Sequence, residues 1–292
     1  MSADSVNDDA GHFVIENGRR SIRHLLAPLD RRSGLQADLL SFKLDGEQQR
    51  DGGHRPPLQD LLPFTLGGDE QQGIPRFVFH GPNSGDPIRL GIFAAIHGDE
   101  PAGALALVRF LQDLLAEPAL AENYVIHAYP ICNPTGFEDN TRASRRGLDL
   151  NREFWKSSAE AEVGVLEHEL RTMRFDGIIQ LHADDTSDGI YGFVRGATLT
   201  EEILRPALEE AAKVLPLNRR PLIDGFAAQD GIIYDHYEGV LAAHVQMKPV
   251  PFEIIFETPH LAPMDRQVAA LDIFLRAVLT EYRRLISFAQ NI

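Results

Sequence analysis

The chain has 292 residues, of which 43% are hydrophobic and 24% charged, a composition typical of a folded globular protein. Its 43 acidic and 28 basic residues give a formal net charge of -15, which disfavours nucleic acid and anionic membrane surfaces as partners. No apolar run approaches the roughly 20 residues that a membrane-spanning helix needs. The single cysteine, Cys132, excludes an intrachain disulfide, and the N-terminus has no basic region followed by an apolar stretch. We therefore expect a cytoplasmic protein.

The first 70 residues differ in pattern from the rest. Residues 1–10 are acidic and lack apolar periodicity, which predicts disorder, and residues 48–57 are polar and rich in glycine and proline, which is typical of a loop. Between them, the apolar residues of 35–42 are compatible with a short helix or a strand. We divide the chain into an N-terminal extension, 1–70, of unknown role, and a main domain, 71–292.

From residue 75 onward, apolar runs typical of strands alternate with helical patterns. The predicted strands cover residues 76–80, 89–96, 124–130, 177–182, 190–194 and 252–256. The predicted helices cover residues 101–115, 158–173, 200–215 and 264–288, and Pro206 must kink the third or lie in its first turns. This alternation predicts an α/β protein with a mixed or largely parallel sheet covered by helices on both faces.

The most informative segment is His97-Gly98-Asp99-Glu100, which follows the apolar run 91–96. It puts an imidazole and a carboxylate three residues apart on a strand-to-helix turn, where α/β proteins build their sites. His182, at the end of a later strand, would meet them at the same edge of a parallel sheet. Two imidazoles and one carboxylate form a common zinc donor set, so we predict one zinc ion per chain. Either histidine alone would more simply be a surface or capping residue.

Arginines gather in one stretch of this acidic chain. Asn133-Pro134-Thr135-Gly136, typical of a turn, is followed by four arginines within residues 142–152. The planar guanidinium suits a carboxylate or a developing oxyanion. A solvated basic loop explains the middle two arginines equally well, whereas Asn151 and Arg152, which have apolar neighbours, favour a ligand contact.

Near the C-terminus, Glu253 and Glu257 lie in or at the end of an apolar strand. A carboxylate in such a place is costly unless it is paired or used. We predict that Glu257 is the general base, which takes a proton from the attacking water and passes it to a leaving nitrogen. The alternative is a strand-end carboxylate that reaches solvent. Glu253 is expected to make a structural contact.

Together these residues resemble the zinc carboxypeptidase family, in its short bacterial branch, and the related succinylglutamate desuccinylase/aspartoacylase group. The resemblance spans roughly residues 75–260 and is most specific in the Thr-Arg and Asp-Leu-Asn-Arg elements of residues 141–152. It implies a mixed, largely parallel eight-stranded sheet between helices, with 71–292 as the catalytic domain. Thr135 stands where the family has aspartate, a change expected to affect the turn more than the chemistry.

By this resemblance, the two histidines and Glu100 bind zinc, and Glu257 serves as general base and acid. Arg142 is implied to stabilise the oxyanion of the tetrahedral intermediate. Asn151 and Arg152 are implied to bind a carboxylate of the substrate.

Two further segments carry open alternatives. The family uses a tyrosine on a mobile loop, and Tyr234, with Tyr237 beside it, lies in the corresponding region between glycines. A packing tyrosine in an ordinary loop explains the pattern as well. The acidic residues of 184–188 either meet a substrate ammonium group or are solvated loop caps, and we favour the second interpretation.

We therefore predict a zinc-dependent hydrolase that cleaves an amide bond next to a free carboxylate, as a metallocarboxypeptidase or peptide amidase acting on small peptides. The nine-residue spacing from Arg142 to Asn151 and the tyrosine-bearing loop favour this over an N-acyl amino acid deacylase. A non-catalytic protein of the same fold that binds a carboxylate ligand is the alternative from another class. Side-chain specificity and oligomeric state leave no signal in the sequence.

Overall fold

The structure, a computed structural model, describes residues 5–7, 12–30, 32–42, 72–83, 85–235 and 237–289. The loop predicted at 48–57 lies outside the described residues, as does most of the stretch 1–10 that was predicted to be disordered. Within that stretch, Ser5–Asn7 forms strand β1, which pairs antiparallel with β2 (Val14–Glu16).

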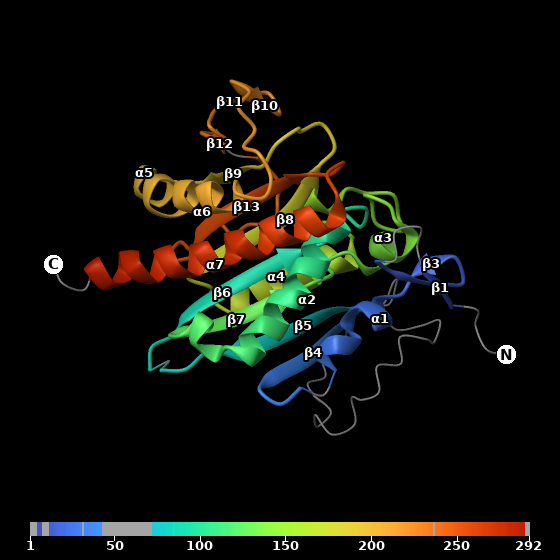
Figure 1. Cartoon of the computed structure of the whole chain (residues 1–292). Coiled ribbons are helices and arrows are strands. Elements are labelled where there is room, and N and C mark those ends of the chain that lie inside the picture. The colour runs from blue at the N-terminus through green and yellow to red at the C-terminus, as the bar shows by residue number, and fades with distance from the viewer. Residues whose placement is uncertain are drawn as a thin grey trace.

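A single mixed sheet of ten strands forms the centre of the described molecule (Figure 1). Its order is β10-β11-β12-β9-β13-β8-β6-β7-β5-β4. The central strands β13, β8, β6 and β7 run parallel, and the outer strands pair mainly antiparallel. The strands are β4 (Leu35–Phe42), β5 (Gln72–His80), β6 (Ile88–Ala94), β7 (Tyr124–Tyr129), β8 (Gly177–Asp184), β9 (Tyr191–Val194), β10 (Leu222–Ile223), β11 (Phe226–Gln229), β12 (Ile232–Ile233) and β13 (Phe252–Pro259).

The predicted α/β fold with a mixed sheet between helices is confirmed. The described sheet has ten strands, two more than expected, because the short hairpin β10–β11 extends it beyond β12. Residues 35–42, compatible with either element in the sequence, form the edge strand β4 and pair along their whole length with β5.

Helices cover both faces of the sheet (Figure 1). α1, α2, α6 and α7 contribute to the core on one face, and α4 packs on the other. Successive residues of β8 divide between these layers, since Ile178 joins the α4 side and Ile179 the opposite side. The helices are α1 (Ile22–Leu26), α2 (Pro101–Ala116), α3 (Pro134–Asp139), α4 (Ala161–Thr172), α5 (Ala197–Leu199), α6 (Arg205–Ala211) and α7 (Met264–Ala289).

The helix predicted at 200–215 is interrupted near its proline. A π-helical turn over Thr200–Leu204 leads into α6, where Pro206 occupies the first turn. Because α5, the π-helical turn and α6 follow one another without a gap, Pro206 lies inside a continuous helical segment, and the π-helical turn beside it is a distortion typical of a proline there.

The N-terminal residues share the core of the main domain. Phe13 and the α1 residues Ile22 and Leu26 are buried in the cluster that also holds α2 and the sheet strands. The division into an extension, 1–70, and a catalytic domain, 71–292, stays a prediction, but the described part of the extension is packed against that domain.

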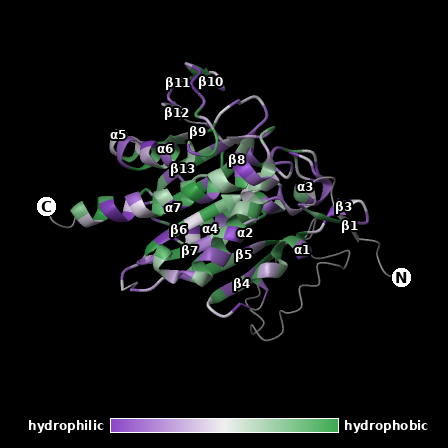
Figure 2. Ribbon diagram, viewed as in Figure 1, coloured by the Kyte–Doolittle hydropathy of each residue, from purple (hydrophilic) through white to green (hydrophobic). Residues whose placement is uncertain are grey.

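Among the described helices, none combines the length and apolar character needed to cross a membrane. The longest of them, α7 with 26 residues, alternates hydrophilic and hydrophobic stretches along its length (Figure 2).

A buried ion-pair network joins the edge of the sheet to α4. Arg76 of β5, only 8% exposed, pairs with Glu169 at 2.7 Å and with Asp38 of β4 at 2.6 Å. The hydroxyl of Tyr129 donates a hydrogen bond to Glu169 at 2.7 Å. The guanidinium therefore holds two carboxylates from separate elements.

Replacing Arg76 with methionine should destabilise the protein by about 3 kcal/mol, because Glu169 would be left buried without its cation. Denaturant unfolding measures the change. Lys213→Met, which removes a surface pair with Glu210, is the matched control and should change stability by no more than about 0.5 kcal/mol. Equal effects for the two variants would contradict a structural role for the network.

Candidate metal centre

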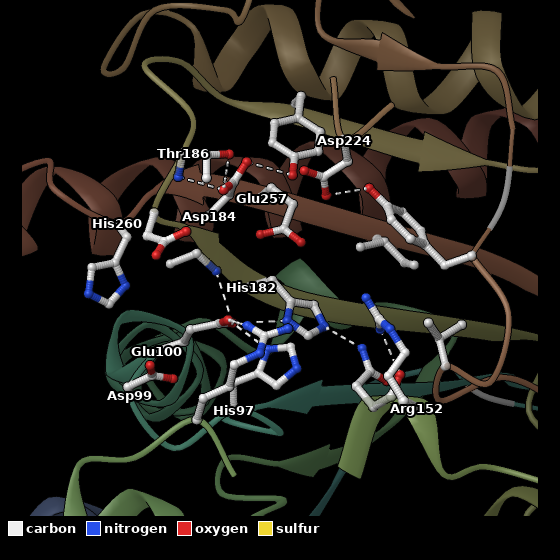
Figure 3. Close-up of a pocket in the computed structure, with 18 residues that line it drawn as sticks. His97, Asp99, Glu100, Arg152, His182, Asp184, Thr186, Asp224, Glu257 and His260 are labelled. Atoms are coloured by element: carbon white, nitrogen blue, oxygen red, sulfur yellow. Dashed lines mark hydrogen bonds and ion pairs between the residues drawn. The ribbon is translucent and has the colours of Figure 1, made fainter. Parts of the chain in front are cut away.

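The predicted ligands meet at the carboxyl edge of the parallel strands. His97 lies just beyond the end of β6, Glu100 immediately precedes α2, and His182 lies near the end of β8. On the neighbouring strand β13, Glu257 is the direct register partner of His182. Parallel strands place their carboxyl ends at one edge, so residues 160 positions apart in the sequence converge there (Figure 3).

His97, Glu100 and His182 form a buried cluster that can hold a metal ion. One nitrogen or oxygen from each residue lies within 4.8 Å of the others. The two Nδ1 atoms approach opposite oxygens of the same carboxylate, His97 at 2.6 Å from Oε1 and His182 at 2.9 Å from Oε2. Two imidazole nitrogens and a carboxylate are the donor set of catalytic zinc sites, so the residues present fit this ion.

Further polar groups fix the imidazole rings from outside. Nε2 of His97 lies 3.1 Å from Oδ1 of Asp149, and Nε2 of His182 lies 3.4 Å from Nδ2 of Asn151. Such contacts to the distal ring nitrogen orient a metal-binding histidine. Asp149 belongs to the Asp-Leu-Asn-Arg string at residues 149–152, but the sequence pattern indicated no role for it.

Charge within the cluster is balanced internally. Burial disfavours protonation of His97, but the charges of Glu100 and Asp149 outweigh it and raise the pKa of this histidine to about 9. For Glu100, burial acts against ionisation, yet the two histidines hold the pKa of the carboxyl well below its usual range. Burial lowers the pKa of His182.

The turn of residues 97–100, which carries the predicted ligands His97 and Glu100 and is called the ligand turn, packs closely against α3. The N–H of Glu100 donates to the carbonyl of His97, which closes the turn. The side chain of Asn133 caps α3 by accepting from the N–H of Gly136. A Cβ added to Gly98 would lie 1.9 Å from the carbonyl carbon of Gly136, so only glycine fits at this position. The turn predicted at 133–136 is therefore the capped start of α3, and it supports the ligand turn.

Thr135, where the resembled family has aspartate, is buried in this capped turn. Its hydroxyl accepts a hydrogen bond from the N–H of Arg145 at 3.0 Å, so it positions the arginine-bearing loop.

Glu257 lies in the cavity beside the cluster (Figure 3). Burial raises the pKa of its carboxyl well above the usual range, and the negative charges of Glu100, Asp184 and Asp224 raise it further. A carboxyl with a raised pKa is suited to accept and return a proton. Glu253, on the same strand, accepts a hydrogen bond from the N–H of Ala243 at 2.7 Å, which is the structural contact expected for it.

Arg142, Asn151 and Arg152 all line the same cavity. Arg142 places one guanidinium nitrogen 3.3 Å from Oε1 of Glu100 and another 3.1 Å from Oδ2 of Asp149. Arg152 donates to the carbonyl of Asn151 at 2.8 Å. Its guanidinium carbon lies 5.9 Å from the centre of the Tyr237 ring. The other two arginines of the stretch do not line this cavity.

The cavity, about 350 Å³ in volume, is strongly acidic. Six carboxylates and two arginines are among its lining residues. Asp184 and Asp185 of the acidic loop line it, whereas Asp188 pairs with Arg220 at the surface. Asp184 also caps the loop, since it accepts from the N–H and hydroxyl of Thr186 at 2.7 and 2.8 Å, and the contact with a substrate ammonium group stays a prediction. Asp184 also accepts a hydrogen bond from the hydroxyl of Tyr191 at 2.9 Å.

The two loop tyrosines occupy different places. Tyr237 lines the cavity and donates to Asp224 at 3.1 Å. Tyr234 is 55% exposed and lines a separate depression with Arg195 and Glu201, so the structure does not bring it to the metal cluster. A substrate-binding role for Tyr234 stays a prediction, and Tyr237 is the tyrosine of this loop that the described cavity includes.

The sequence patterns indicated no role for Asp224, Tyr191 and His260, which are among the residues that line the cavity. Asp224 lies between the short strands β10 and β11, which carry too little periodicity to locate it. Tyr191 lies on the strand predicted at 190–194, but no pattern marked its side chain as facing the site. His260 follows β13 directly, and its place after Glu257 on a strand-end segment was an available signal.

Fold and site together define a carboxypeptidase-like α/β protein with a buried His-Glu-His cluster. Residues 87–215 match the family model of the succinylglutamate desuccinylase/aspartoacylase catalytic domain. This match confirms the resemblance predicted from the sequence, which includes both that group and the zinc carboxypeptidases.

Solved structures of low sequence identity share the fold. A proposed metallopeptidase from Shewanella amazonensis has a TM-score of 0.67 and 22% identity, with 88% of this chain and 90% of that chain covered. A metallo-carboxypeptidase from Burkholderia cenocepacia has a TM-score of 0.60 and 18% identity, covering 90% and 68% of the two chains. A succinylglutamate desuccinylase from a Silicibacter species has a TM-score of 0.54 and 18% identity, covering 86% and 67%.

Among curated proteins, Carboxypeptidase SOL1 of Arabidopsis thaliana is 37% identical over 67 residues. That segment is 20% of this chain, and it spans only 13% of the length of the curated relative.

The packing of the ligand turn makes Gly98→Ala a sharp test of this site. The added methyl group forces the turn or the start of α3 to move, so zinc affinity should fall at least about tenfold. Competition with a chelator measures it. Gly164→Ala, which adds the same methyl group in open space on α4, should leave zinc affinity unchanged. Wild-type affinity in Gly98→Ala would contradict the described packing.

Proposed function

We propose that this protein is a zinc-dependent hydrolase that cleaves an amide bond next to a free carboxylate, most simply a metallocarboxypeptidase or peptide amidase for small peptides. The observation that carries the proposal is one cavity that contains the His97–Glu100–His182 cluster, the carboxyl of Glu257 and two guanidinium groups. We retain the cytoplasmic location predicted from the sequence as part of this proposal.

Zinc in this cluster would supply a Lewis acid that polarises the substrate carbonyl and makes a water more acidic. Glu257 takes the proton from the attacking water and later delivers it to the leaving nitrogen. Its position beside His182 on adjacent parallel strands keeps the carboxyl at a fixed place next to the cluster. Burial and the neighbouring carboxylates raise the pKa of this carboxyl, which favours a proton-accepting role.

The arginines divide the work of anion recognition. Arg142 contacts Glu100 and so lies close to the proposed metal position. Negative charge develops on the carbonyl oxygen of the substrate as water attacks, and the Arg142 guanidinium stabilises that charge. Arg152 binds the substrate carboxylate through its planar fork, and the ring of Tyr237 lies against the guanidinium. Asn151, between these two arginines in the sequence, binds the backbone of Leu241, whose N–H donates to its Oδ1 at 2.8 Å.

A second candidate is an N-acyl amino acid deacylase. The match of residues 87–215 to the desuccinylase/aspartoacylase model favours it. The same residues would perform the hydrolysis, and only the group on the acyl side of the bond differs. Comparing hydrolysis of C-terminal dipeptides with that of N-succinyl and N-acetyl amino acids by the zinc-loaded protein separates the two.

Glu257→Gln should reduce turnover by roughly a hundredfold or more, since a general base typically contributes at least that factor, while the zinc content stays unchanged. Steady-state hydrolysis and elemental analysis measure these two quantities. Glu253→Gln is the matched control, because it makes the same change on the same strand outside the cavity and preserves the oxygen that accepts from Ala243.

Activity of Glu257→Gln within about tenfold of the wild type would refute this role. Zinc bound in full with no hydrolysis of either substrate class would instead support the non-catalytic, carboxylate-binding alternative.

A further inference from the structure

An N-terminal hairpin contacts the metal-ligand turn directly. Strands β2 and β3 (Arg19–Arg20) pair antiparallel, and Arg20 lies at the end of the hairpin. Its Nη1 donates a hydrogen bond to the carbonyl of Gly98 at 3.1 Å. These two residues are 78 positions apart, and Gly98 is the residue that follows the ligand His97.

Neighbouring aromatic rings hold the Arg20 guanidinium in place. Its central carbon lies 4.9 Å from the ring centre of Phe13 and 5.6 Å from that of Phe137 in α3. The two rings pack edge to face at 5.9 Å. A guanidinium between aromatic rings loses much of its rotational freedom before it makes any further bond, so its donor is already directed at the Gly98 carbonyl.

The adjacent arginine fastens the hairpin to the same helix. Arg19 pairs with Asp139 at the end of α3 at 2.8 Å, and both side chains are partly exposed. Within the hairpin, the N–H of Ser21 donates to the carbonyl of Val14 at 2.8 Å. Among the described contacts, Arg19 thus docks the hairpin on α3, whereas Arg20 contacts the ligand turn.

The ligand turn is therefore held from two sides. On one side, Gly98 packs so closely on Gly136 that no side chain fits between them. On the other, Arg20 binds the Gly98 carbonyl and fixes the direction of the peptide group between the two ligands of the turn. A rotation of this peptide would turn the backbone that carries His97 and Glu100.

We propose that Arg20 is a positioning residue for the metal centre, and that the N-terminal hairpin is a working part of the hydrolase. The hairpin lies outside residues 87–215, the part that matches the family model. The proposal rests on the proposed zinc-binding function of the cluster. It gives the extension a role that its sequence pattern did not indicate.

Zinc affinity of the purified full chain tests this directly, with zinc alone as the probe and a chromophoric chelator as competitor. Arg20→Met removes the donor but keeps an unbranched side chain over the rings, so affinity should fall about tenfold, as for other groups that orient metal ligands. Arg20→Lys retains a cationic donor and should fall between Arg20→Met and the wild type.

Arg19→Met is the matched control. It removes the Asp139 pair from the same hairpin and should leave zinc affinity within about twofold of wild type, since exposed pairs contribute little. Thermal unfolding of the metal-free variants separates lost folding from lost positioning, and Arg20→Lys remains informative if Arg20→Met does not fold.

Wild-type zinc affinity in both Arg20 variants would overturn the positioning role, as would an equal loss in Arg19→Met and Arg20→Met. A wild-type chain that binds no zinc would refute the proposed function itself, and with it this proposal. The two failures are distinguishable because the first appears only in the variants.

Discussion

The site is organised around one buried carboxylate. Glu100 presents opposite oxygens to His97 and His182, at 2.6 and 2.9 Å, and also accepts from the N–H of Ala183 at 3.1 Å. A buried carboxylate is tolerated only when such partners compensate its desolvation. The interaction joins the turn between β6 and α2, which carries His97 and Glu100, to β8, which carries His182, so it sets the distance between the two segments that hold the proposed metal ligands. The remaining groups of the site are arranged about this pair of elements.

Electrostatics then distinguish two sides of the cavity. Arg142 neutralises part of the charge of Glu100 and Asp149 on the side of the ligand turn. On the opposite side lie Asp184 and Asp224, and among the described ion pairs neither joins an arginine of the cavity. Their negative charges help to raise the pKa of Glu257. Glu257, the proposed general base, thus lies between carboxylates that pair with Arg142 and carboxylates that accept hydrogen bonds from Tyr191 and Tyr237.

The sequence was sufficient where local patterns carry the chemistry. The periodic strands and helices predicted the α/β fold. Because parallel strands end at one edge of a sheet, the sequence also predicted that His182 lies beside the turn at residues 97–100, as it does in the structure. It was insufficient where position depends on short or distant segments. The side chains of Tyr234 and Tyr237 diverge within one loop, and no periodicity distinguishes them. The contact of Arg20 with Gly98 depends on tertiary packing, which a single sequence does not encode in its spacing.

The central claim is that His97, Glu100 and His182 bind one zinc ion, and the most direct test is metal content per chain by elemental analysis. Wild type and His182→Ala are prepared side by side with His260→Ala, which alters a cavity-lining histidine outside the cluster. We predict about one zinc per chain in wild type and His260→Ala, and its loss in His182→Ala. No zinc in any of the three proteins, even after zinc is supplied, would contradict the account.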